Sequence, residues 1–389
     1  MLLFLPIFYG HKILFKFWLK RCHLLLALIS GVFLINIAIS GALLLFAKDI
    51  QRFINPQYWL VENLPKNSAH LKPLPLSVLM AKVEEKTGKK ISVIELPQQE
   101  EHVWQISLDD KTMVNINPYN ANIVLTHRFY DTFYGFTMAW HRWLLYRNSE
   151  GEKPLQVIVA TTALLFIVQT LLGFYLWIKP KHRLKRLKIK KKAKLKTKLY
   201  QLHGSLGVFT TMPLLLIAFS GITFYWPQPT KAIVQGLTGS LVEQAKYQYQ
   251  AEKTNNTEST DAVIKPNKLD IAYERGLASL SNSRVFRIYP PNNDNEVLRL
   301  RIETASESHA NSWVWVDQKT GKVLNVFNAG DTSLATQVWN FRYKFHIGEF
   351  IAFPIKLLWL LFSLLPIFFF ASGIYFWFKN KRTGNKAVC

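Results

Sequence analysis

The sequence predicts an integral membrane protein with four transmembrane α-helices in a bundle built from a tandem parallel repeat, and with two α+β modules outside the bilayer. Three observations carry this prediction. Four segments are apolar over the length of a bilayer crossing, nearly all of the net charge of +23 lies in three short segments, and one pattern of histidine and glycine occurs in both halves of the chain. A chain that is 49% hydrophobic is also not wholly disordered.

The four predicted spans contain no Lys, Arg, Asp or Glu. A bilayer crossing takes about 20 apolar residues, and a helix buried in a soluble protein is rarely apolar on all sides for so long. The first span is too long and begins too far from the N-terminus for a signal peptide. The predicted spans are Leu24–Ala47, Leu155–Ile178, Ser205–Trp226 and Leu357–Phe378.

The basic residues predict the orientation of these spans. Residues 1–23, 179–198 and 379–389 carry four, twelve and four Lys or Arg, and no acidic residue. Cytoplasmic loops hold an excess of basic residues. The sequence therefore predicts a multi-pass protein of the bacterial inner membrane. Its predicted cytoplasmic segments are 1–23, 179–204 and 379–389, and its predicted periplasmic modules are 48–154 and 227–356.

Composition and motifs exclude several classes of protein. Two cysteines, Cys22 and Cys389, are too few for a disulfide-rich scaffold or a four-ligand zinc site. No nucleotide-binding, zinc-protease or nucleophile-elbow motif is present. Because the spans lack ionisable residues, they lack the groups on which proton- and ion-coupled transporters depend. Topology explains the basic loop between two spans, so nucleic acid is not an expected partner.

The repeat is visible in the order of a few residues. His23 is followed 17 and 18 residues later by Ser40-Gly41, and His203 is followed at the same spacings by Ser220-Gly221. The second and fourth spans end on similar stretches, GFYLW and GIYFW. Both halves start on the same side of the membrane, so the pseudo-two-fold axis is expected along the membrane normal.

Each predicted periplasmic module has one amphipathic helix pattern followed by four patterns with the period of a strand. In the first module these are Pro75–Gly88, Ile91–Glu95, His102–Leu108, Thr112–Asn117 and Asn122–Thr126. In the second they are Lys268–Ser279, Arg284–Tyr289, Glu296–Glu303, Ser312–Val316 and Lys322–Phe327.

Four of the ten histidines occupy matching places at the ends of the spans. His23 and His203 belong to the cytoplasmic side, and His141 and His346 to the periplasmic side. Imidazole is a common axial ligand of haem iron, and cores of helix bundles often hold cofactors. The two-fold axis would pair His23 with His203 around an inner haem and His141 with His346 around an outer haem. Without a Cys-x-x-Cys-His motif, both are expected to be haem b.

Ordinary structural roles remain open for these and neighbouring residues. A single histidine at a membrane interface is more often a polar interfacial residue than a ligand. The Ser-Gly pairs permit either a close porphyrin or simple helix packing. Two roles remain open for the basic residues Arg142, Arg342 and Lys344: they pair with haem propionates, or they extend to the membrane interface. Met138 either ligates the haem iron or packs against neighbouring side chains.

The remaining six histidines have no mates in the repeat and are interpreted as solvated or loop residues, with a haem role left open for His127. They are His11, His70, His102, His127, His182 and His309.

The sequence resembles the PepSY-associated transmembrane family from about His23 to Lys379. His203-Gly204-Ser205-Leu206-Gly207, with Ser220-Gly221 near the end of the span, is similar to the signature of its transmembrane helix. The segment 316–323, VDQKTGKV, resembles the strand–turn–strand ending of a PepSY module. The first module departs from that pattern, because Asn120-Ala121-Asn122 stands where Thr-Gly is expected.

The family includes iron-regulated inner-membrane proteins, and one branch is similar to ferric-siderophore reductases with two b-type haems on histidines at the span ends. The resemblance implies His23, His203, His141 and His346 as haem iron ligands, and a ferric siderophore as substrate. It implies a haem-dependent reductase that takes electrons from an unidentified cytoplasmic or membrane donor, such as flavin or quinol, and releases Fe(II).

Two other functions stay open at this point. The PepSY-like modules could bind or restrain a periplasmic peptidase, with the spans as anchors. The chain could instead be a siderophore permease, because spans without charges argue against ion coupling but not against passive passage.

Overall fold

A computed structural model describes residues 5–61, 72–180, 182–247, 268–291, 297–307 and 309–384. The chain forms two compact units. The membrane unit comprises Met1–Ala47, Phe136–Lys231 and Tyr343–Cys389. The sheet unit comprises Lys48–Gly135 and Ala232–Arg342.

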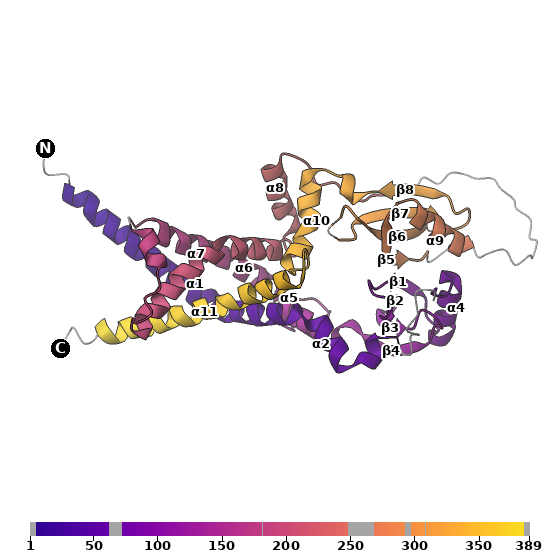
Figure 1. The fold of residues 1–389 in the computed structure, drawn as a ribbon, viewed down its shortest axis with the longest axis horizontal. Coiled ribbons are helices and arrows are strands. Elements are labelled where there is room, and N and C mark those ends of the chain that lie inside the picture. The colour runs from indigo at the N-terminus through magenta and orange to yellow at the C-terminus, as the bar shows by residue number, and fades with distance from the viewer. Residues whose placement is uncertain are drawn as a thin grey trace, which may run out of the picture. The chain divides into compact units, whose positions relative to one another are not determined.

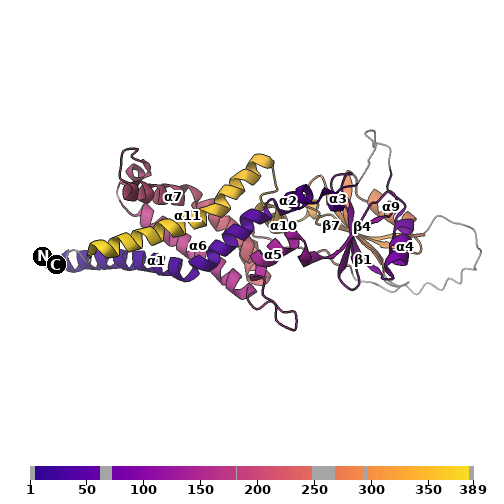
Figure 2. The same cartoon turned by 90° about the horizontal axis from the view of Figure 1, so that it is seen from below.

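Four helices of the membrane unit are long and apolar enough to cross a bilayer. They are α1 (Leu5–Leu44), α6 (Gln156–Ile178), α7 (Leu195–Ile222) and α11 (Phe353–Gly384). The chain is therefore a multi-pass membrane protein with four candidate spans. These helices lie alongside one another (Figures 1 and 2), and the N-terminal end of α1 and the C-terminal end of α11 lie at the same end of the bundle.

Each helix of the bundle has two neighbours. Helix α1 packs against α6 and α11, and α7 packs against the same two helices, so α1 and α7 are diagonal to each other. Leu34, Phe166, Leu214 and Ala218 are buried where the helices meet. Dispersion and close packing hold helices together in a bilayer, where burial of apolar side chains adds little.

The helices continue beyond the predicted spans. Helix α7 begins at Leu195, inside the basic loop that was expected to extend to residue 204, and α1 begins well before Leu24. A helix satisfies its own backbone hydrogen bonds, so it need not end where the apolar residues end. Lys and Arg can extend along the helix surface toward water. At its other end, α7 stops at Ile222, and α8 (Pro227–Thr238) follows.

Short helices connect the spans to the strands along the chain. They are α2 (Ala47–Ile54), α3 (Pro56–Trp59), α5 (Phe133–Trp143) and α10 (Leu334–His346), with the 3-10 turns η2 (Phe129–Asp131), η3 (Arg183–Leu187) and η4 (Ala329–Asp331). Helices α5 and α10 each follow the last strand of a four-strand set. They carry His141 and His346.

The sheet unit is built on one antiparallel sheet of eight strands in the order β4-β3-β2-β1-β5-β6-β7-β8. The first four strands are β1 (Ile91–Glu95), β2 (Trp104–Leu108), β3 (Thr112–Ile116) and β4 (Ile123–Arg128). The last four are β5 (Ser283–Tyr289), β6 (Val297–Thr304), β7 (Ser312–Asp317) and β8 (Val323–Phe327). Strands β1 and β5 pair with Ile94 opposite Ile288. The two sets of strands therefore form a single sheet (Figure 1).

Helices α4 (Leu76–Thr87) and α9 (Lys268–Ala278) pack over the same face of this sheet and share one hydrophobic core (Figure 2). Leu79 and Val83 of α4 are fully buried, as are Leu300 and Val314 of the strands. Asp270 of α9 also accepts hydrogen bonds from the backbone N–H and the hydroxyl of Ser77, at 2.9 and 2.5 Å. Core and hydrogen bonds both join the two helices.

The turns that precede β4 and β8 have the same conformation, although their sequences differ. Gly321 has φ of +67°, and Ala121 takes φ of +60° at the matching place. In one turn the Asn117 side chain accepts from the N–H of Tyr119, and in the other Asp317 accepts from Lys319. Asn120-Ala121-Asn122 departs from the Thr-Gly that a PepSY module is expected to have, but the turn keeps its conformation. Ala121 adopts the left-handed backbone conformation, which is normally disfavoured for alanine.

Candidate functional site

His141 and His346 lie together in the membrane unit. His141 is in the last turn of α5 and His346 is the last residue of α10. Their ring centroids are 6.2 Å apart, and the ring planes are inclined by 51°. The Phe224 ring packs edge-on against His346 at 5.6 Å. Two short helices that follow different strand sets thus bring their imidazoles to one place.

Hydrogen bonds to helix α1 orient the ring of His141. Its Nδ1 lies 3.1 Å from the carbonyl oxygen of Ile37 and 3.2 Å from the Ser40 hydroxyl oxygen. The Ser40 hydroxyl donates its own proton to the carbonyl of Asn36 at 2.6 Å. Both neighbours of Nδ1 are therefore acceptors, and Nδ1 carries the proton.

His346 has the same arrangement on helix α7. Its Nδ1 lies 3.2 Å from the Ile217 carbonyl oxygen and 3.0 Å from the Ser220 hydroxyl oxygen. The Ser220 hydroxyl donates to Ile217 at 2.8 Å. The Ser-Gly pairs noted in the sequence thus contribute acceptors for the outer histidines.

The inner histidines contact the other two helices. Nδ1 of His23 donates to the carbonyl of Gln169 on α6 at 3.1 Å. Nδ1 of His203 lies 2.6 Å from the Ser372 hydroxyl on α11, and that hydroxyl donates to the carbonyl of Phe368 at 2.8 Å.

Three of the four rings lie directly on a glycine. A Cβ atom added to Gly41 would lie 3.1 Å from Cε1 of His141, and one added to Gly221 would lie 3.1 Å from Cε1 of His346. At Gly173 the corresponding distance to His23 is 3.2 Å. A Cβ at Gly373 would meet nothing within 4 Å, so His203 does not share this contact.

The hydrogen bonds define one tautomer for all four histidines. A carbonyl oxygen only accepts, and the Ser372 hydroxyl beside His203 donates its own proton to Phe368. Nδ1 is therefore the protonated nitrogen of each ring, and a neutral imidazole then has a lone pair on Nε2. Among the residues that the structure describes, none forms a hydrogen bond with Nε2 of these four rings. Metal-bound histidines commonly donate their second N–H to a carbonyl in this way.

Burial keeps the outer imidazoles neutral. It lowers the pKa of His141 to about 3, with a further contribution from His346. It lowers the pKa of His346 to about 4. Both Nε2 lone pairs are therefore available well below neutral pH.

This donor set fits a haem iron. A metal–imidazole bond is about 2 Å long and the ring centre lies roughly 1 Å beyond the nitrogen, so two axial imidazoles have centres about 6 Å apart. His141 and His346 have this separation. Within the described residues there is no group of three or more His, Cys, Asp or Glu that could hold a bare metal ion. The described part also includes one buried oxygen without a partner beside the inner pair, Oε1 of Gln169.

Other residues singled out in the sequence lie elsewhere or have partners of their own. Met138 is half-buried on α5, one turn before His141. His127 belongs to the sheet unit, where it packs on Trp59 at 5.6 Å. Its Nε2 lies 3.4 Å from the Asn115 side-chain oxygen. His70 lies outside the described residues, and His182 is exposed.

The basic residues near the outer histidines also have protein partners. The Arg142 guanidinium lies 5.8 Å from the Trp143 ring, and Arg342 lies 3.9 Å from the Trp339 ring. Lys344 is 3.8 Å from Glu349. Whether they also meet propionates stays a prediction.

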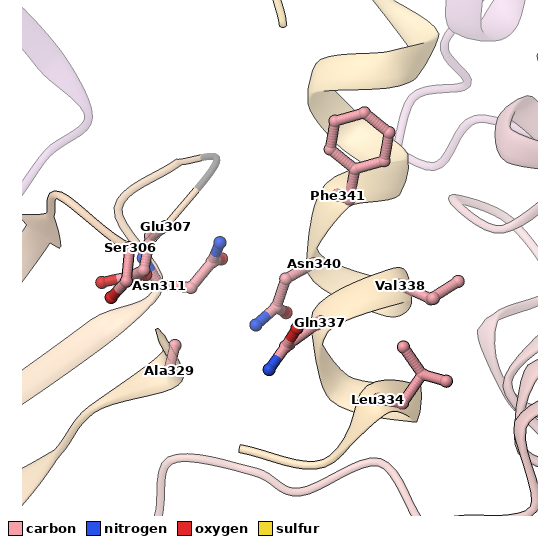
Figure 3. Close-up of a pocket in the computed structure, with 9 residues that line it drawn as sticks. All are labelled: Ser306, Glu307, Asn311, Ala329, Leu334, Gln337, Val338, Asn340 and Phe341. Atoms are coloured by element: carbon pink, nitrogen blue, oxygen red, sulfur yellow. The ribbon is translucent and has the colours of Figure 1, made fainter. Parts of the chain in front are cut away.

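A pocket of about 310 Å³ lies in the sheet unit between α10 and the loop before β7. Figure 3 shows Gln337 and Asn340 of α10 facing Asn311 and Glu307 across it. The Glu307 carboxylate already accepts from Thr304, Asn311 and Ser312. The lining holds amides and hydroxyls but no cationic side chain, so this pocket does not suit an anionic chelate.

Sequence reasoning missed two contributors to the inner pair. Ser372 was not singled out, although Ser372-Gly373 repeats the Ser-Gly pairs of the first and third spans. Gln169 contributes only its backbone carbonyl, for which side-chain identity gives no signal.

Comparison with known proteins supports one family. Residues 20–380 match the model of the PepSY-associated TM region. Among curated proteins, none matches the chain. Since the match covers most of the sequence, the chain belongs to the PepSY-associated TM region family.

Proposed function

We propose that this protein is a di-haem b electron-transfer protein of the bacterial inner membrane that reduces Fe(III) in a periplasmic siderophore and releases Fe(II). His23 and His203 hold the inner haem, and His141 and His346 hold the outer one. In this proposal the two halves of the chain are a tandem parallel repeat, in which α1 and α6 correspond to α7 and α11.

One observation carries the proposal: all four histidines donate from Nδ1 to an acceptor on a neighbouring span. An interfacial histidine with no further role has no reason to present the same nitrogen to a helix four times. Histidines that bind metal have such a reason, because the second hydrogen bond orients the ring and raises the basicity of Nε2.

The protein itself positions the four histidine rings. Ser40, Ser220 and Ser372 accept from the rings, and Gly41 and Gly221 let the outer rings lie close to α1 and α7. Bound haem iron supplies reversible one-electron chemistry. Seventeen residues separate His23 from Ser40 on α1, which is about 25 Å of helix. The two histidine pairs therefore lie near opposite faces of a bilayer core about 30 Å thick.

Reduction of the iron takes one electron and no proton: Fe(III) in the chelate gains the electron and becomes Fe(II). A cytoplasmic or membrane donor, such as a reduced flavin, a quinol or a reductase, loses that electron, and a quinol or reduced flavin releases its proton on the donor's side of the membrane. Siderophores hold Fe(II) far more weakly than Fe(III), so the metal is released. Spans without Asp, Glu, Lys or Arg are consistent with this chemistry.

The basic segments support the orientation. The N-terminal end of α1 and the C-terminal end of α11 share one end of the bundle (Figure 1). Lys and Arg are frequent in these end segments of both helices. We infer that this end is cytoplasmic, because basic residues are retained there.

Absorption spectra of the purified full-length protein test the proposal. We expect a Soret band that sharpens and shifts on dithionite reduction, with α and β bands typical of bis-imidazole haem, and two haems per chain by pyridine haemochrome assay. Periplasmic ferric siderophore should then reoxidise the reduced protein. Protein that is purified from haem-replete cells without haem would refute the proposal. A peptidase-restraining or permease function would survive that result.

A further inference from the structure

The sheet face opposite the shared core carries a line of arginine and aromatic side chains. Alternate residues of β6, starting from Leu298, are buried in the core. Since side chains alternate along a strand, Arg299 and Arg301 lie on the other face. The register places Arg299 opposite Trp315 and Arg301 opposite Trp313. We use the name Arg–Trp face for Arg287, Tyr289, Arg299, Arg301, Trp313 and Trp315.

The aromatic rings of this face stack in sequence. Tyr289 and Trp313 have centroids 5.4 Å apart and planes inclined by 29°. Trp313 and Trp315 follow at 6.1 Å and 23°. Tyr247 stacks on Trp315 at 6.0 Å and covers that end of the row. The rings thus stack on one another across β5, β6 and β7. Trp315 is only 5% exposed, so Tyr289 and Trp313 form the accessible part of the row.

The guanidinium groups lie over these rings. Arg299 is 5.2 Å from the centre of Tyr289, and Arg301 is 5.9 Å from the centre of Trp313. Arg301 also donates from Nε to the carbonyl of Ala310 at 2.6 Å. Cation–π contacts and this hydrogen bond hold flexible side chains in fixed positions.

The face concentrates positive charge. Arg287 and Arg301 are direct cross-strand partners, and like charges in that relation destabilise a sheet. Glu95 offsets part of this charge through hydrogen bonds to Arg287 at 2.9 and 2.6 Å. Burial, and then Arg287, lower the pKa of Arg301. Among the residues of this face that the structure describes, one carboxylate stands beside three guanidiniums, which gives a net positive charge.

The fold does not require these residues, as the hairpin β2–β3 demonstrates. In that hairpin the pairs on the same face are Gln105 with Asn115 and Ser107 with Met113. Its core positions remain apolar and fully buried, like those of β6–β7. The same hairpin geometry thus forms with neutral side chains, and the arginines and tryptophans of β6–β7 need another explanation.

We propose that the Arg–Trp face binds an anionic ligand with planar aromatic groups. The identity of the ligand rests on the proposed function. Under that function, the ligand is a ferric chelate whose iron is held by catecholate oxygens. Guanidinium groups pair with anionic oxygens. Aryl rings also pack against the edges of aromatic side chains, and Tyr289 and Trp313 are only partly buried. An aliphatic hydroxamate chelate, neutral or cationic, offers neither contact. Charge complementarity therefore selects the aryl chelate.

Calorimetric titration of the full-length protein with redox-inert gallium chelates tests this assignment. We expect Ga(III) tris-catecholate, a trianion, to bind at least about tenfold more tightly than Ga(III) desferrioxamine B, an aliphatic cation. Arg299→Gln and Arg301→Gln should each weaken tris-catecholate binding about tenfold, and Arg301→Lys should restore it only in part, because lysine lacks the planar group. Raising the salt concentration should weaken binding.

Lys89→Gln is the matched control. It removes one positive charge from an exposed residue of the same unit that pairs with Asp110, and should change affinity by less than about twofold. Arg299 is exposed, so its variant is expected to fold even where Arg301→Gln does not. Equal affinity for the two chelates, no saturable binding, or equal losses in Lys89→Gln and Arg299→Gln would overturn the proposal. If the purified protein contains no haem but binds the gallium tris-catecholate, only the proposed function is refuted. If the protein reduces only hydroxamate chelates through its haem, only the proposal for the Arg–Trp face is refuted.

Discussion

The Nδ1 atoms of His141 and His346 both donate to a helix carbonyl one turn before a glycine, and the two rings lie 6.2 Å apart. Donation toward the helix leaves Nε2 as the free nitrogen of each ring. Under the proposed function, these two nitrogens would hold the outer haem between them.

Removing an outer ligand should remove one haem and keep the other. We expect His141→Ala and His346→Ala each to lower the haem content to about half, because the inner pair is built from different helices. His182→Ala, at an exposed position, should retain the full content. Pyridine haemochrome assay against protein concentration measures the ratio. If the His141→Ala and His182→Ala proteins retain the same haem content, the outer site has been assigned wrongly.

Ser372 and Ser220 should differ in how much each one slows haem loss. His203 has the Ser372 hydroxyl as its Nδ1 partner, whereas His346 has both Ser220 and a carbonyl. Loss of such an outer hydrogen bond weakens metal binding about ten- to a hundredfold. Ser372→Ala should therefore speed haem loss to apomyoglobin about tenfold, and Ser220→Ala should have a smaller effect. The reverse order would contradict the hydrogen-bond assignment.

The glycine contacts can be tested with an internal control. Gly221→Ala adds a Cβ that would lie 3.1 Å from Cε1 of His346, which must tilt the ring. Gly373→Ala adds a Cβ with nothing within 4 Å. We expect the first substitution to change the electron paramagnetic resonance g-values of the outer haem, and the second to leave both haems unchanged. Identical spectra for the two variants would mean that the ring does not lie on Gly221.

Asp270 should stabilise the sheet unit by linking α9 to the first turn of α4. Asp270→Ala removes two hydrogen bonds to Ser77 and leaves that helix end without a side-chain acceptor, a loss of about 1–2 kcal/mol. Glu274→Ala, on the exposed side of the same helix, should cost far less. Thermal unfolding of the full-length protein, followed by tryptophan fluorescence, compares them. Similar melting temperatures for the two variants would rule out a stabilising link.

Orientation is open to a direct chemical test. In a variant without Cys22 and Cys389, a single cysteine at Lys190 should react with a membrane-impermeant maleimide only after the inner membrane is opened. A cysteine at Lys89 should react in spheroplasts. Both residues are exposed, so access depends on the side of the membrane. Labelling of Lys190→Cys in intact spheroplasts would reverse the topology.

Local patterns in the sequence predicted most of the elements. The expected strand Ile91–Glu95 is β1, and the expected helix Lys268–Ser279 is α9, one residue shorter. Side chains that alternate in polarity, or recur every three to four residues, report on burial within one segment. The four apolar helices followed from the length and the apolar composition of their segments. His23 and His203 were visible because their spacing to a Ser-Gly pair repeats, and His141 and His346 because each precedes an apolar span.

Tertiary structure decided which segments meet. No local pattern states that β1 pairs with β5, because an edge strand accepts any partner with a compatible backbone. The acceptor of His23 is a backbone carbonyl, and the acceptor of His203 is Ser372, far along the chain. The Arg–Trp face arises from strand register, which brings Arg301 opposite both Arg287 and Trp313. Sequence alone determined the spans, the strands and the four histidines. Their partners follow from long-range packing, which depends on how separate segments fit together.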